Sequence, residues 1–352
     1  MGADSPVVEV TLNGTSVGSN LISVVISRDM GQPDALACVV SNQNDIYADL
    51  MEIGATVEVT VGTSTKVFVG EVVGYEPQYK GGEKTTLQIR GYNKFHRLSR
   101  KKKSVTFQDK TDQAIIEDVC KGYTGLTADW KHAKSIEYKH VYQHNLTDLE
   151  FVRVRAARMG CHVWCVDSKL NVKEPDFGNA NPTLKLSVDA DGDLHTFTPR
   201  MSSAAVVNKV TVKGWNPETK ELITGDSGTY ATSLGRDDAI KACSKFGKED
   251  TFTVDHPIWS KEEAVALAIA RCRDLNMTFI TGEAECGGKS VITANTELGQ
   301  TVEITSNSAN ANDPFNGNYY IMGLEYRYTQ PKGKDGGLMA WIRFARDARC
   351  KR

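Results

Sequence analysis

The chain has 352 residues, of which 40% are hydrophobic and 24% charged, a composition typical of about two to three globular domains rather than a disordered chain. Lys and Arg total 42 against 44 Asp and Glu, so the net charge of −2 lacks the basic excess of proteins that bind bare nucleic acid. The aliphatic stretch 264–270 is too short to span a bilayer and the first residues lack a secretory pattern, so we expect no membrane insertion by the chain itself. Eight cysteines without framework spacing predict reduced thiols and synthesis in a cytosol.

Residues 1–97 are expected to form antiparallel β structure curled into a barrel or sandwich. A short helix is predicted at residues 45–51. The predicted strands are rich in β-branched residues and bounded by turn residues; they are 7–12, 21–27, 36–40, 56–61, 67–75 and 85–92.

Residues 98–178 are expected to form a small α+β module. Thr111 is a candidate N-cap before an apolar helical stripe, and Thr147 with Glu150 forms a capping box for a second helix that ends at Gly160. Strands at 161–166 and 170–172 follow.

The β pattern returns in residues 179–352. One helix interrupts it, beginning at the capping box 260–263, and the polar, Gly-rich segment 224–238 is expected to be an exposed loop. The predicted strands are 184–188, 206–212, 251–254, 277–283, 290–294, 301–305, 319–328 and 338–344.

Four blocks of the first ninety-odd residues recur near the C-terminus in the same order. The offset drifts by a few residues between blocks, as it does when strands are kept and turns vary. We therefore predict a mainly β protein with two tube-like antiparallel β-barrels, joined by the α+β module, and three such chains would present six similar barrels in a ring. The paired blocks are 53–60 with 298–305, 68–70 with 315–317, 72–76 with 321–325, and 89–90 with 342–343.

Motifs spread along the whole chain resemble one known family. Phe68-Val69-Gly70-Glu71-Val72 is similar to its F-x-G-x-V strand, and the segment 143–151 (QHNLTDLEF), closing at Gly160, is similar to its Q-x-N-x-[ST]-D-x-x-F…G pattern. The exit at 92–103 and the segments 298–303 and 317–321 resemble further parts of it. The family is the baseplate hub of contractile phage tails, the late control gene D protein, which includes the N-terminal hub part of the type VI secretion spike protein VgrG.

The resemblance implies a virion structural protein without enzymatic activity. It implies a homotrimer whose pseudo-hexameric ring initiates the tail tube above, carries the central spike below and contacts other baseplate proteins, after assembly in the bacterial cytoplasm. Because the sequence ends at Arg352 without a spike-like repeat, we expect the trimeric spike to be a separate chain. A phage, a tailocin and another injection system all remain open as the particle.

Two acidic or nucleophilic segments have simpler interpretations. Gly225-Asp226-Ser227-Gly228 imitates the nucleophile segment of serine proteases, but no histidine stands in a matching motif, so we interpret it as a polar turn. The segment 189–193 (DADGD) begins like a calcium loop, yet Leu194 and Arg200 occupy the positions that need Gly and Glu, which favours a β-turn.

The segment Cys161-His162-Val163-Trp164-Cys165, with His140 and His144 nearby in sequence, suggests a zinc site. On a strand, however, the two cysteines point to one face and His162 to the other, and a second cysteine pair is missing. We therefore expect buried thiols.

The basic run 97–103 (RLSRKKK) has no interleaved aromatic residue on which a base could stack, so we interpret it as a solvated linker or a subunit contact. The alternative is contact with DNA or cargo in transit through a central channel.

We assign no catalytic, cofactor-binding or metal-binding residue. Two other functions remain: a hub that also hydrolyses peptidoglycan, with Glu150 or Glu137 as the acid to test, and a carbohydrate- or DNA-binding β protein.

Overall fold

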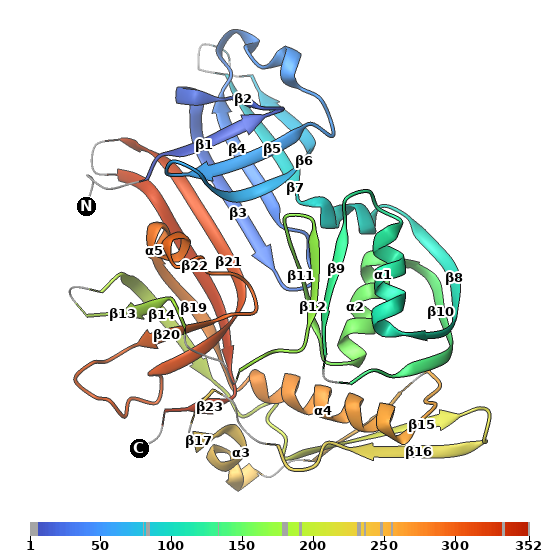
Figure 1. Cartoon of the computed structure of the whole chain (residues 1–352). Coiled ribbons are helices and arrows are strands. Elements are labelled where there is room, and N and C mark those ends of the chain that lie inside the picture. Colours follow the sequence, from blue (N-terminus) through green and yellow to red (C-terminus); the bar gives the residue numbers. More distant parts are fainter. Residues whose placement is uncertain are drawn as a thin grey trace.

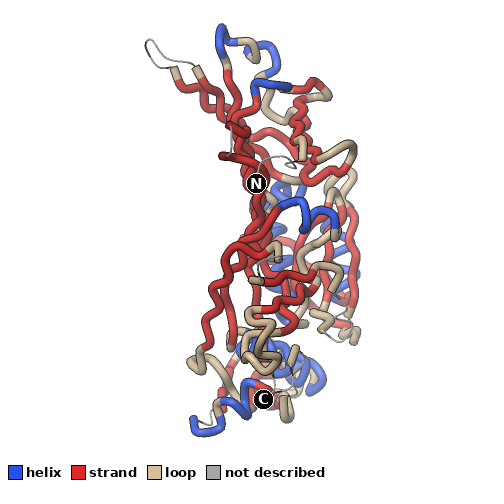
Figure 2. The backbone as a smooth tube through the Cα atoms, turned by 90° about the vertical axis from the view of Figure 1, so that its left-hand side faces the viewer, coloured by secondary structure: helices blue, strands red, loops and turns tan. Residues whose placement is uncertain are grey.

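The computed structural model describes residues 6–79, 81, 85–132, 134–177, 182–189, 192–230, 234–235, 237–246, 249–254, 256–332 and 335–350. Figure 1 shows an N-terminal unit (6–92, blue) above, a C-terminal unit (185–201 and 280–346, largely orange and red) to the left, and a middle module (94–173, green) to the right. A smaller insertion (209–277) lies below them. In Figure 2 the strands form a continuous layer over nearly the full height of the molecule.

Thirteen strands belong to one large sheet, in which every pair is antiparallel except β13 with β20. The order along its main path is β14-β19-β22-β21-β3-β4-β7-β6-β5-β1-β2, and β20 pairs with both β21 and β13. Its N-terminal strands are β1 (Val8–Leu12), β2 (Thr15–Ser16), β3 (Leu21–Asp29), β4 (Ala35–Ser41), β5 (Thr56–Val61), β6 (Thr65–Gln78) and β7 (Thr86–Tyr92). Its C-terminal strands are β13 (Lys185–Ser187), β14 (Leu194–Met201), β19 (Ile280–Gly287), β20 (Thr301–Thr305), β21 (Gly317–Lys332) and β22 (Asp335–Arg346).

The two units repeat one strand order. The N-terminal unit runs β3-β4-β7-β6-β5 and the C-terminal unit runs β14-β19-β22-β21-β20. The pairing between β6 and β7 shifts at Val73, and the pairing between β21 and β22 shifts at the corresponding Met322. A second shift recurs at Ile22 in β3 and at His195 in β14. Because a β-bulge adds one residue at one defined place, two matching bulges make the two units copies of one backbone plan.

The strand registers correct one block of the sequence alignment. Gly70 lies opposite Val57, whereas Tyr319 lies opposite Val302, the counterpart of Val57. Gly70 therefore corresponds to Tyr319 and not to Gly317, and the block at 68–70 was aligned two residues away from its true counterpart. The turn before β21 had supplied a chance Phe-x-Gly match.

A seam joins the two units edge to edge. Ser23–Asp29 of β3 pairs antiparallel with Gly323–Thr329 of β21, so the sheet continues from one unit into the other. The largest apolar core likewise contains buried residues of both units, such as Val10, Ile89 and Ile342. The sequence predicts two tube-like antiparallel β-barrels. In the described residues the strand pairing shows a mainly β protein with large antiparallel sheets and does not close into a barrel.

The middle module has its own core, which includes Phe95, Ile116, Phe151 and Val172. Thr111 and Thr147 are the N-caps of its two helices, and the capping box at Thr147 is complete, as the sequence predicts. Its three strands before the second helix were not predicted. The elements are η4 (Lys94–Ser99), β8 (Lys102–Thr111), α1 (Asp112–Lys121), β9 (Thr127–Lys131), β10 (Glu137–Thr147), α2 (Asp148–Arg158), β11 (His162–Val166) and β12 (Lys169–Lys173).

The insertion between β14 and β19 packs a three-stranded sheet on one helix around a separate small core. Ser260 is the N-cap of this helix, as the sequence predicts, but the capping box is incomplete, because the Glu263 carboxylate accepts from the Trp259 N–H. The elements of this core are β15 (Lys209–Asn216), β16 (Glu221–Asp226), β18 (Glu249–Thr253) and α4 (Lys261–Met277). Between β16 and β18 the chain forms β17 (Asp237–Asp238), α3 (Ala239–Ala242) and η5 (Ser244–Phe246), and β17 pairs with the C-terminal β23 (Ala348–Arg349).

Three local predictions were wrong. The strand predicted at 290–294 is the helix α5 (Gly288–Thr293), whose buried positions Gly288 and Val291 are one helical turn apart. The helix predicted at 45–51 is two 3₁₀ turns, η2 (Gln43–Asp45) and η3 (Ala48–Leu50), because Asn44 and Asp45 have positive φ. The loop predicted at 224–238 begins inside β16, and its residues 231–233 and 236 lie outside the described ones.

Within the described residues, no helix is both long and apolar enough to cross a membrane.

Candidate functional site

The protease-like segment is structural. Gly225 and Asp226 end β16, and a Cβ on Gly225 would lie 2.5 Å from the backbone nitrogen of Val265 in α4. The Ser227 hydroxyl accepts a hydrogen bond from the Val210 N–H at 3.1 Å and donates one to the Gly228 carbonyl at 3.0 Å. The glycine thus allows strand and helix to approach, and the serine satisfies the backbone where β16 ends.

The calcium-like segment also forms local bonds. The Asp189 carboxylate accepts hydrogen bonds from the hydroxyls of Ser187 and Ser308 at 2.5 and 2.7 Å, and these bonds hold its pKa below the usual range. The Gly192 N–H donates to the Asp189 carbonyl at 2.7 Å, a bond typical of a β-turn. Residues 190 and 191 of this segment lie outside the described ones.

The cysteines of the zinc-like segment pack into the core of the middle module, and burial raises the pKa of Cys161 to about 12. His162 points the other way, and its Nδ1 lies 2.8 Å from the Tyr320 hydroxyl of β21. Burial, with Arg273 nearby, lowers the pKa of His162 to about 4. Within the described ranges, no group of three or more His, Cys, Asp or Glu side chains could hold a metal ion.

Of the two carboxylates named for hydrolysis, Glu150 serves as part of a helix cap. Glu150 accepts hydrogen bonds from the N–H and the hydroxyl of Thr147, at 2.8 and 2.9 Å, and these bonds lower its pKa. Glu137 begins β10, opposite Thr111. A general acid needs a raised pKa and a free proton, so the cap geometry assigns Glu150 to helix formation.

The basic run is divided between the core and the surface. Arg97 pairs with Glu71 of β6, and Lys103 reaches the buried carboxylate of Asp148 at 2.5 Å. The residues between them, Arg100 to Lys102, are exposed. The run therefore links the N-terminal unit to the middle module and offers only a short exposed basic surface.

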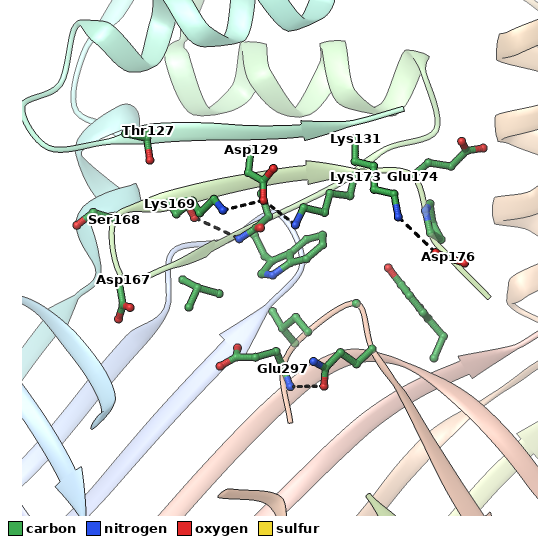
Figure 3. A pocket seen from close by; sticks show the side chains of 18 residues that line it. Thr127, Asp129, Lys131, Asp167, Ser168, Lys169, Lys173, Glu174, Asp176 and Glu297 are labelled. Atoms are coloured by element: carbon green, nitrogen blue, oxygen red, sulfur yellow. Dashed lines mark hydrogen bonds and ion pairs between the residues drawn. The ribbon is translucent and has the colours of Figure 1, made fainter. Parts of the chain in front are cut away.

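A cleft of about 590 Å³ lies between the middle module and the C-terminal unit (Figure 3). Trp164 of β11 lines it beside Gly299, whose φ of +80° is left-handed and whose Cβ, if present, would lie 3.0 Å from the indole. Asp129 of β9 bridges Lys169 and Lys173 of β12 at 3.0 and 2.8 Å. This cleft could not be predicted from the sequence, because its residues come from segments more than 100 residues apart.

Two aspartates of the cleft are paired with lysines. Hydrogen bonds from Lys173 and Lys169 lower the pKa of Asp129, and Lys131 pairs with Asp176 at 3.4 Å. Glycoside hydrolysis needs one carboxyl kept protonated by its surroundings. The lysine-paired Asp129 has the opposite property, so Asp129 does not fit the role of a general acid.

One ion pair of Arg28 also crosses the seam, and a second lies within the N-terminal unit. Arg28 of β3 reaches Glu297, just before β20, at 3.1 Å and Asp34 at 3.6 Å. All three side chains are mostly buried. Burial, opposed by the charge of Arg28, raises the pKa of Asp34 to about 7.

The fold is shared with solved tail proteins at low sequence identity. A tail protein from Neisseria meningitidis MC58 is 13% identical, with 98% of this chain and 97% of that chain covered and a TM-score of 0.73. The 43 kDa tail protein of prophage MuSo2 from Shewanella oneidensis is 16% identical, with 98% and 100% covered and a TM-score of 0.72. The c3393 protein of E. coli, described as a component of the type VI secretion system similar to T4 tail proteins gp27 and gp5, is 10% identical, with 96% and 76% covered and a TM-score of 0.62.

No curated protein matches the sequence. The model of one family does, described as the Alg8 N-terminal domain, and it matches residues 29–330. Its description names neither a tail nor a hub, so the hub family expected from the sequence is not confirmed by it. Because the match spans most of the chain, the chain belongs to the Alg8 N-terminal domain family.

Proposed function

We propose that this chain is a structural hub subunit of a phage tail or a related contractile injection system. Three copies form a pseudo-hexameric ring that joins a sixfold tail tube above to a threefold central spike below. The observation that carries the proposal is the duplicated unit: one chain holds two copies of the same strand order, with matching bulges at Val73 and Met322. A closed ring of three such chains presents six similar units.

The fold supports a role in a tail. The solved tail proteins match 96% or more of this chain, so the likeness includes the middle module and the insertion as well as the sheet. We propose segments at 1–97, 98–178 and 179–352, the first and last each a tube-like barrel once assembled. Phe95 lies close to the boundary at 97/98 and Val172 close to the boundary at 178/179, and both belong to the core of the middle module. Residues 178–181, at the second boundary, lie outside the described ones.

The partners follow from this geometry. We propose a tail tube protein on one rim of the ring, a separate trimeric spike protein on the other, and further baseplate proteins around it, with DNA or cargo in transit through the lumen. Assembly takes place in the bacterial cytoplasm and the product is part of the particle. Adhesion comes from large, partly apolar interfaces rather than from site chemistry.

The test is the mass and symmetry of the full chain in solution. Native mass spectrometry is expected to give three times the chain mass, and negative-stain averages should show threefold particles with six similar lobes. A chain that stays monomeric at every concentration measured contradicts the proposal.

The hydrolase alternative has a direct test. Purified protein added to cell-wall suspensions is expected to leave their turbidity unchanged. Clearing that is lost in Glu137→Gln would establish the hydrolase, and Thr147→Ala, which disturbs the same module without touching Glu137, is the matched control.

A further inference from the structure

The two units differ in one strand edge, which is paired in the C-terminal unit and unpaired in the N-terminal unit within the described residues. In the C-terminal unit, the edge of β21 beyond Met322 is covered by β3 of the N-terminal unit. The matching edge of β6 beyond Val73 has no strand against it in the described residues, and β14, the counterpart of β3, pairs there only with β19. The chain thus contains one complete seam and the two separate halves of a second one.

We propose that β14 of one copy pairs antiparallel with the end of β6 in a second copy of this chain, in the register of the internal seam. This pairing rests on the proposed ring of three chains, because it is the contact between neighbouring copies that closes the ring. The bulges fix the register, because Gly74 corresponds to Gly323 and Thr198 to Val25. The expected pairs are Gly74 with Ser202, Tyr75 with Met201, Glu76 with Arg200, Pro77 with Pro199, Gln78 with Thr198, and Tyr79 with Phe197.

One face of this expected pairing is apolar throughout. In the seam, Tyr326 lies opposite Ile26 and both side chains are buried in the core. The corresponding face of the second seam brings Tyr75 against Met201 and Tyr79 against Phe197. Tyr79, which directly follows β6, is 67% exposed in the single chain. Pairing would cover it with the ring of Phe197.

The other face is polar and complementary in charge. In the seam, the Ser27 hydroxyl donates to Glu325 at 2.8 Å across a directly opposed pair. In the second seam, Arg200 corresponds to Ser27 and Glu76 corresponds to Glu325, so a base lies opposite an acid. This pair stands at a position without backbone hydrogen bonds, where opposed side chains lie closest. Arg200 is exposed and has no ion pair within the described part of the chain.

Two prolines face each other in this register. The Ser202 N–H donates to the Phe279 carbonyl at 2.9 Å, so by alternation the ring nitrogen of Pro199 points to the free edge of β14. The pairing of β6 with β7 continues on both sides of Pro77, so its ring nitrogen also points outward. The second seam therefore lacks two hydrogen bonds that the internal seam has, and side chains must supply its specificity.

The test is a disulfide across the expected interface. Gln78→Cys and Thr198→Cys are combined in one full-length chain in which the two cysteines that are not fully buried, Cys243 and Cys350, are replaced by serine. Opposed residues without backbone bonds have Cα atoms about 4.5 Å apart, within the range of a disulfide. The control pairs Gln78→Cys with Ser202→Cys, which is about 13 Å out of register.

We expect mild oxidation to give dimers and trimers on a non-reducing gel from the matched pair and only monomers from the control. Equal cross-linking of the two pairs, or none while native mass spectrometry shows a trimer, overturns this inference and leaves the ring proposal standing. A chain that is monomeric by mass overturns both.

The charge pair gives an independent test. Arg200→Glu is expected to weaken assembly about tenfold or more, Arg200→Lys to leave it nearly unchanged, and Arg200→Glu with Glu76→Arg to restore part of the loss. The second change also removes the contact of Glu76 with Arg90, at 2.7 Å, so Glu76→Arg alone is measured beside it. No recovery in the double variant would contradict the register.

Discussion

Replacing the two outward prolines should strengthen assembly. Pro77 and Pro199 occupy the positions that Tyr326 and Ile26 hold in the internal seam, and there the opposed residues belong to the hydrogen-bonded set. Pro77→Thr and Pro199→Val each restore one N–H donor to the interface. The change acts on the assembled state, because in the single chain both ring nitrogens face away from the neighbouring strand.

The magnitude follows from the number of bonds restored. A backbone hydrogen bond contributes about 1 kcal/mol net, so each single variant should tighten one interface about fivefold. The double variant restores both bonds of one opposed pair and should tighten it by about 2 kcal/mol, or about 30-fold. Because the two residues are directly opposed, their effects can couple, so both single variants are measured beside the double variant.

The assay is a dilution series followed by analytical ultracentrifugation. The concentration at which trimers dissociate should fall in the order unchanged chain, single variants, double variant. Thermal melting of diluted, monomeric protein serves as the control for folding. Dissociation at an unchanged or higher concentration in the double variant, with normal melting, would refute the register and the reasoning from the seam.

Three further predictions concern stability. Burial lowers the pKa of His162 to about 4, below the value of about 6.5 for an unfolded histidine. The free energy of unfolding is therefore highest above pH 6.5 and declines by about 3 kcal/mol as the pH falls toward 4. Urea unfolding at several pH values should show this decline and its loss in His162→Gln. Gly54→Ala and Gly299→Ala both place a side chain at positive φ, which costs about 1–2 kcal/mol. Gly299→Ala should lower the melting temperature more, because its Cβ would also meet Trp164, whereas the Cβ of Gly54→Ala would meet nothing within 4 Å. Thr147→Ala should cost about 1 kcal/mol by removing the N-cap of α2, and denaturant unfolding that shows no change would contradict the capping assignment.

Local signals in the sequence predicted local structure well. The N-caps at Thr111, Thr147 and Ser260 were found because a capping residue and its helix are adjacent in the chain. The strands of the repeated blocks were found because they are buried on at least one face and rich in β-branched residues. The polar strand β8 was missed, since most of its residues are exposed and it pairs only with β10.

The contacts that join the parts could not be predicted. The seam pairs β3 with a strand about 300 residues away, and no property of either strand alone names its partner. The bulge at Met322 leaves no mark in composition, although it fixes which residues of the two units correspond. The cleft around Trp164 and Asp129 likewise depends on the way in which two modules pack together. Glu150, Ser227 and Cys161 lie in local hydrogen bonds or in the core, and not in the arrangements that their motifs suggest.

The difference between the two seams has a physical reason. The internal seam forms within one chain, so its strands meet at a high effective concentration and Tyr326 with Ile26 can make the full set of backbone bonds. The free edges of β6 and β14 must instead remain unpaired in each newly made chain, and exposed edges of a sheet readily pair with any other strand. A proline that points outward removes a donor from that edge. Pro77 and Pro199 therefore protect the single chain, while the charge and aromatic pairs on either side of them select the correct second copy.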